Sequence, residues 1–164
     1  MSLRFQALIL AAVVSSAGSI PAAPAFAVVP NSASTVDTDT NGLALQGYDP
    51  VAYFVDGQPE KGKADLKIDH GGATYYFASA KNMEAFKANP SAYLPQYGGF
   101  CAMGASFNHK FEGDPKVWRI VDNKLYLNFN PAVGHRWEQD VPTNISRAND
   151  NWPQIKDKTP DQLQ

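Results

Sequence analysis

The sequence predicts an α+β fold, in which a small antiparallel sheet is built from β-hairpins and short helices pack on it. Two pairs of segments alternate apolar and polar residues on either side of a tight turn. Short segments with helical periodicity lie between these pairs and after them. Twelve glycines and twelve prolines indicate many turns and short elements.

The first hairpin is expected over residues 66–77. Both strands alternate in polarity, and Gly71-Gly72 between them supplies the positive φ values that a tight primed turn requires. A two-residue turn fixes the register, and the paired side chains that share the core face are then His70 with Ala73, Ile68 with Tyr75 and Leu66 with Phe77.

The second hairpin is expected over residues 117–128, with its turn at Asp122-Asn123, because these two residue types tolerate positive φ. Its register places two pairs on the core face, Trp118 with Leu127 and Ile120 with Leu125. Arg119 and Tyr126 fall on the opposite face, where an aromatic side chain is a candidate for a pocket or an interface.

Three helices accompany the hairpins. Ser79 is a typical N-cap for a helix over residues 80–88, which Asn89-Pro90 ends. Asn130 caps a second helix, with Pro131 at its favoured first position. A third helix begins near Pro142, and its apolar anchors are Ile145, Ala148 and Trp152.

The chain divides into four parts. Residues 1–27 have the layout of a signal peptide, with Arg4, an apolar run too short to span a bilayer, and a small-x-small cleavage site ending at Ala27. A flexible leader is expected over 28–41, the domain over 42–155 and a flexible tail over 156–164. These features predict a periplasmic or secreted protein that does not insert into the membrane after cleavage.

The charge pattern excludes one class of partner. The formal net charge is −2, and the charged residues are scattered along the chain. Proteins that bind nucleic acid neutralise phosphates with a basic stripe, and this sequence has none. We therefore expect no nucleic-acid partner.

Four motifs occur in the order in which they occur in the YHS domain family, and they resemble in particular its exported, stand-alone version. The motifs lie within Tyr48–Phe54, Tyr75–Ser79, Phe86–Tyr93 and Tyr97–Ala102, and the resemblance extends over about residues 42–153. Related YHS domains occur in heavy-metal transport ATPases and near some oxygenases, so the resemblance implies metal binding, with copper as the suggested metal. The ATPase version carries cysteines where this chain has Ala52, Ala78 and Met83.

Cys101 is the only cysteine, so no disulfide can form within the chain. Three interpretations stay open: a buried and inert side chain, pairing with another chain, or a ligand or reactive group. Thiolate, thioether and imidazole suit copper, and imidazole also suits zinc. The candidate metal ligands are Cys101, Met103, His109 and His70, although no spacing within this set forms a known metal motif.

A small-molecule site is the other candidate. Aromatic walls with a few polar groups are typical of ligand pockets, and glycines let a ligand approach the backbone closely. The candidate cofactor-binding residues are Tyr76, Tyr97, Gly98 and Gly99. No protease, acyltransferase or hydrolase motif surrounds Cys101, so we expect no catalytic residues.

The resulting functional hypothesis is non-catalytic binding of a metal ion, copper or zinc, or of a small ligand near Cys101. The alternatives are a structural or protein-interaction module with a buried cysteine and, with less support, a thiol enzyme.

Overall fold

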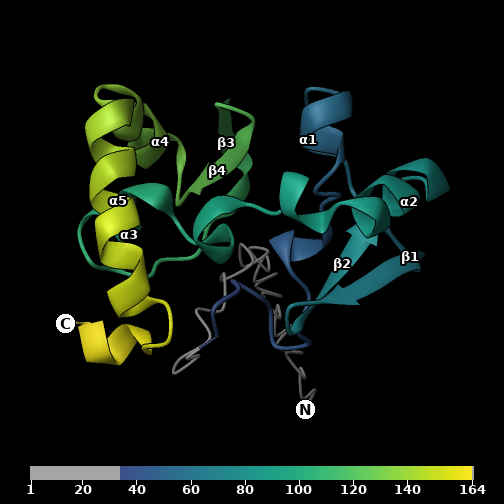
Figure 1. Ribbon diagram of the computed structural model, residues 1–164, viewed down its shortest axis with the longest axis horizontal. Helices are drawn as coiled ribbons and strands as arrows, with labels where there is room; N and C mark the ends of the chain where they lie inside the picture. Colours follow the sequence, from purple (N-terminus) through teal and green to yellow (C-terminus); the bar gives the residue numbers. More distant parts are fainter. Residues whose placement is uncertain (1–33, 164) are drawn as a thin grey trace, which may run out of the picture.

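The computed structural model describes residues 34–163, so the expected signal peptide and the first residues of the leader lie outside the described part (Figure 1). The α+β class is confirmed. The strands are β1 (Lys63–His70), β2 (Ala73–Phe77), β3 (Asp114–Val121) and β4 (Lys124–Asn128). The helices are α1 (Ala52–Val55), α2 (Ala80–Ala88), α3 (Ala102–Ser106), α4 (Pro131–Glu138) and α5 (Val141–Ile155). Over residues 34–163, no helix has the length and apolar character needed to cross a bilayer.

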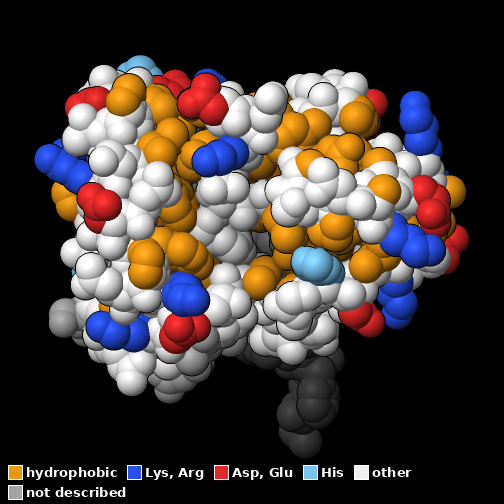
Figure 2. Space-filling model, viewed as in Figure 1, with side chains coloured by type: hydrophobic (Ala, Val, Ile, Leu, Met, Phe, Trp, Pro, Cys, Tyr) orange, Lys and Arg blue, Asp and Glu red, His pale blue; other side chains and the backbone are white. Residues whose placement is uncertain are grey.

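The two hairpins form two separate sheets, rather than the one small sheet that the sequence suggested. In Figure 1, α1, α2 and the β1–β2 hairpin make up one half of the molecule, and α3, α4 and α5 lie on the far side of the β3–β4 hairpin. Hydrophobic side chains reach the surface over both halves (Figure 2). Since apolar exposure is common on any protein surface, exposure alone does not locate a binding site.

Strand β4 divides the interior, because both of its faces are buried. Leu125 and Leu127 belong to the hydrophobic cluster formed with the β1–β2 half. Tyr126, between them, points the other way and packs against Trp137 in the cluster of the C-terminal helices. The sequence-based assignment of Tyr126 to a non-core face was therefore wrong, because helices from later in the chain cover that face.

The first hairpin has the expected register near its turn, where Ile68 pairs with Tyr75 and His70 with Ala73. The expected pairing of Leu66 with Phe77 was wrong. An irregularity between Lys63 and Lys67 places Lys63 opposite Phe77 instead. Leu66 still packs against the core cluster, so the bulge changes the pairing without losing that apolar contact.

The second hairpin has the predicted register in all the pairs expected from the sequence, including Trp118 with Leu127 and Ile120 with Leu125. Asp122 and Asn123 have φ values of 49° and 56°, as the turn chemistry requires. The helices over 80–88 and from 131 are also confirmed, with Ser79 and Asn130 accepting the capping hydrogen bonds. The last helix begins at Val141.

The described parts of the expected leader and tail, residues 34–41 and 156–163, make contacts with the domain. Residues 34–41 of the leader follow the domain surface, where Thr38 forms an isolated bridge with Ala44. In the tail, residues Pro160–Leu163 form a short 3-10 helix, and Leu163 packs against the C-terminal cluster. The contact of Leu163 could not be read from local sequence patterns, because most members of this cluster are distant in the chain.

Candidate ligand cavity

A cavity of about 700 Å³ opens between the leader and the segment that follows Cys101. We call it the leader cavity. Its lining comes from residues 36–40, Leu43, Leu45, Gln46, Gly99, Phe100, residues 109–113, Leu127, Phe129, Pro160 and Asp161. Ligand sites for small molecules commonly have volumes of roughly 300–1,000 Å³ and mostly apolar walls. This cavity matches both features.

The leader closes one wall of the cavity through hydrogen bonds at Asp37. The Asp37 backbone N–H donates to the Gly98 carbonyl at 2.9 Å, and Gly113 N–H donates to Asp37 Oδ2 at 2.8 Å. Gly98 has a φ of 62°, and a Cβ there would collide with the Thr35 carbonyl. The absence of a side chain at Gly98 therefore lets the backbone of the leader, rather than a ligand, approach this position closely.

The side-chain carboxyl group of Asp37 has a raised pKa. Burial raises the pKa of Asp37 from its ordinary 3.8 to about 7, and the charge of Glu112 adds to the effect. The Gly113 N–H and the charge of Lys110 act in the opposite direction. Burial also raises the pKa of Glu112, while a hydrogen bond from Gln46 lowers it. Two carboxyl groups with raised pKa values therefore line one cavity.

Asp37 should make the stability of the protein depend on pH. Between about pH 4 and pH 7 the folded protein keeps a proton on Asp37 that the unfolded chain has released, so the free energy of unfolding falls as pH rises. Asp37→Asn should remove this fall, which we expect to be about 1–2 kcal/mol for a half-buried, partly screened group. Urea unfolding of both proteins at several pH values measures it. A stability difference between parent and variant that does not change with pH would contradict the assignment.

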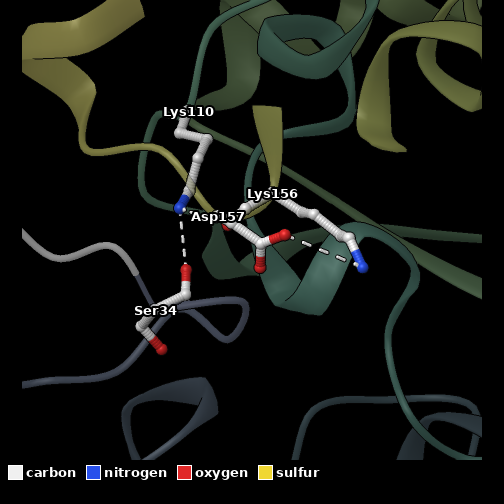
Figure 3. Close-up of polar contacts among 4 residues, drawn as sticks. All are labelled: Ser34, Lys110, Lys156 and Asp157. Carbon is white, nitrogen blue, oxygen red and sulfur yellow. Dashed lines mark hydrogen bonds and ion pairs between the residues drawn. The ribbon is translucent and has the colours of Figure 1, made fainter. Parts of the chain in front are cut away.

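Lys110 ties the leader to the C-terminal tail (Figure 3). Its Nζ donates to the backbone carbonyls of Ser34 at 2.7 Å, Lys158 at 2.9 Å and Lys156 at 3.0 Å. The residue is only 4% exposed, and Nζ lies 4.6 Å from the centre of the Phe100 ring. Burial lowers the pKa of Lys110, whereas the charges of Asp157 and Asp37 raise it. This lysine therefore holds one end of the cavity together.

Two aromatic side chains at the cavity are unusually exposed. Phe111 and Phe129 are 50% and 48% exposed, and their ring centres lie 6.3 Å apart. The His109 ring lies 5.6 Å from that of Phe111. Phe111 packs so closely over Gly104 that a Cβ there would lie 2.8 Å from its ring. Large apolar side chains this exposed, held beside a cavity, are typical of a binding surface.

Cys101 lies in the interior beneath this region, 1% exposed. Its Sγ caps α3 by accepting from Gly104 N–H at 3.4 Å, and it lies 3.6 Å from Asn128 Oδ1. Burial raises the pKa of the Cys101 thiol, and nearby backbone N–H groups only partly offset this. A raised pKa disfavours the thiolate, which is the form that attacks substrates and binds metals.

The structure places the four candidate metal ligands in different surroundings. His109 lines the leader cavity, whereas Met103 packs against the C-terminal cluster. His70 lies in the other half of the molecule, with its ring 5.8 Å from that of Phe86. Within residues 34–163, no three His, Cys, Asp or Glu side chains are grouped closely enough to hold a metal ion. Of the four candidates, His70 therefore lies apart from the segment that carries Cys101, Met103 and His109.

The four candidate cofactor-binding residues also separate. Gly99 lines the leader cavity, and Gly98 is covered by the leader. Tyr97 is buried, and its hydroxyl lies 3.0 Å from Asn149 Oδ1 of α5. Tyr76 lies on β2, with its Cβ and backbone against Gly62. Of this set, the structure places Gly99 in the cavity wall.

Sequence reasoning missed the residues that define the cavity, namely Asp37, Lys110, Phe111, Glu112 and Phe129. They lie in the leader and in irregular segments without periodicity. The one available signal was the occurrence of Phe111 and Phe129 outside both apolar patterns of the hairpin that they flank. Aromatic residues placed outside a periodic core pattern are candidates for a surface function.

Comparison with known proteins gives one match. Residues 51–97 match the family model described as the YHS domain, so a YHS domain is present in this part of the chain. The matched range runs from the start of α1 to the 3-10 helix Gln96–Gly99, and it ends before Cys101. No curated protein and no solved structure matches the chain.

Proposed function

We propose that this chain is an exported YHS-domain protein that binds a small ligand in the leader cavity and does not catalyse a reaction. The single observation that carries the proposal is the pairing of an apolar-walled cavity of about 700 Å³ with two half-exposed phenylalanines. Export to the periplasm or the medium is supported by the signal-peptide pattern of residues 1–27.

The small-ligand proposal takes precedence over the metal proposal because of where the soft ligands lie. The sulfur of Cys101 is buried and engaged in capping α3. Met103 packs against the C-terminal cluster, whereas His70 lies against Phe86 in the other half of the molecule. A metal site needs several donors converging on one point. The cavity, in contrast, has mostly apolar walls, which suit a ligand with an apolar body.

Titration with the uncharged dye N-phenyl-1-naphthylamine tests the proposal, because its fluorescence rises in an apolar environment. We expect one saturable site in the parent protein. Phe111→Ala and Phe129→Ala should each weaken binding about threefold to tenfold, the usual range for one aromatic contact. Phe107→Ala is the matched control, since Phe107 is 54% exposed but does not line the cavity.

Two results would contradict the proposal. One is the absence of saturable dye binding, and the other is equal weakening by all three phenylalanine variants. Titration with Cu(I) and Zn(II) under reducing, anaerobic conditions, beside Cys101→Ser, tests the metal alternative. One tightly bound ion that this variant loses would favour a metal site in place of the small-ligand site.

A further inference from the structure

The charges on the cavity wall are unbalanced. Among the described residues that line it, four carry carboxyl groups, and Lys110 is the one lysine. Lys110 directs its three donors to backbone carbonyls, so its hydrogen-bonding capacity is used within the chain. The ion pairs found within residues 34–163 involve none of the four carboxyl groups, which belong to Asp37, Asp39, Glu112 and Asp161.

Two of these four groups, Asp37 and Glu112, interact electrostatically with each other and keep acceptor capacity for a ligand. Asp39 Oδ1 accepts hydrogen bonds from the backbone N–H groups of Asn41 and Leu43, so this oxygen stabilises the turn that follows Asp39. Asp161 lies in the 3-10 helix of the tail. Asp37 uses Oδ2 for the Gly113 N–H, and no hydrogen bond to its Oδ1 is found from residues 34–163. Glu112 accepts one side-chain bond from Gln46 at 3.0 Å.

The aromatic rim offers a complementary feature on the same cavity. The faces of phenyl rings attract cations, and the attraction strengthens where water is excluded. Phe111 and Phe129 line the same cavity as the four carboxyl groups, and their ring centres lie 6.3 Å apart. Carboxylates and ring faces both favour a positive charge, and the apolar walls favour a hydrocarbon body.

We propose that the ligand of the leader cavity is an organic cation, an amine with an aromatic or branched apolar body, held by Asp37 and Glu112 and covered by Phe111 and Phe129. This inference rests on the proposed ligand-binding function and gives it a chemical class. Besides these two carboxyl groups, the cavity wall carries four other charged or titratable side chains, namely Asp39, His109, Lys110 and Asp161.

Binding of three probes of similar shape tests the class of ligand. Isothermal titration with 2-phenylethylamine, neutral 2-phenylethanol and anionic 3-phenylpropionate should rank the amine first, about tenfold tighter than the alcohol. A bound cation favours ionised carboxyl groups, so the amine should also release protons at pH 6, which titration in buffers of different ionisation enthalpy measures. The alcohol should release none.

Glu112→Gln should abolish the preference for the amine over the alcohol. The variant keeps a side-chain oxygen that can accept the hydrogen bond from Gln46. Asp37→Asn should act in the same direction, while Glu84→Gln on α2, distant from the cavity lining, is the control. If the dye binds but amine and alcohol bind equally, or if Glu112→Gln keeps the preference, the cation proposal fails alone. If neither the dye nor any of the three probes binds, the proposed function itself fails.

Discussion

Replacing Asp49 with alanine should cost about 3–5 kcal/mol in the free energy of unfolding, the range for removing one partner from a buried, charged hydrogen-bond network. Asp49 is fully buried. Its Oδ1 accepts from Val51 N–H at 2.8 Å, and its Oδ2 accepts from Ala78 N–H at 2.8 Å and from Asn82 Nδ2 at 2.7 Å. One side chain therefore ties the start of α1 to the end of β2 and to α2.

Urea denaturation of Asp49→Ala, Asp49→Asn and a control measures this effect. Asparagine offers one acceptor oxygen and turns an amide group toward N–H donors, so Asp49→Asn should lose less stability than alanine but remain destabilised. Asp69→Ala is the control, because Asp69 is exposed and its side chain accepts one hydrogen bond from residues 34–163, that of the Thr74 hydroxyl. A loss below about 1 kcal/mol in Asp49→Ala would contradict a structural role for the carboxylate.

Replacing Lys110 with methionine should have the second largest effect, a loss of about 2–3 kcal/mol. Methionine keeps an apolar stem beside Phe100 but removes the three donors to Ser34, Lys156 and Lys158. Because residues 36–40 line the leader cavity, releasing the leader should also weaken binding of N-phenyl-1-naphthylamine.

Limited proteolysis and urea denaturation test the Lys110 prediction together. The leader around residues 34–40 should become cleavable in Lys110→Met while it stays protected in the parent. Lys87→Met on α2 is the matched control, since the Lys87 side chain is 69% exposed. Equal cleavage and equal stability in the two variants would show that Lys110 does not hold the leader.

The sequence specified the local elements well, because their signals lie within a few residues of each other. The turn at Asp122-Asn123 fixed the register of the second hairpin, and the Ser79 and Asn130 caps marked two helix starts. In the first hairpin the alternating pattern predicted the register of the pairs near the turn, but it did not predict the irregularity between Lys63 and Lys67.

The candidate site was much less predictable. Its wall joins the leader, the segment after α3 and the end of β4, and no local pattern brings these parts together. Gly98 and Asp49 are two residues whose roles depend on contacts that the sequence alone did not predict. The conformational freedom of Gly98 serves the leader rather than a ligand, and Asp49, just before Pro50, carries a buried hydrogen-bond network across three elements.

Hydrogen–deuterium exchange with and without N-phenyl-1-naphthylamine tests the central claim most directly, because it locates the bound ligand on the chain. We predict added protection of backbone amides within residues 36–40, 109–113 and 127–129, the segments that line the leader cavity. Residues 69–74 at the turn of the first hairpin should exchange as before. Protection confined to that turn or to other surfaces, with no change in the cavity segments, would contradict the account.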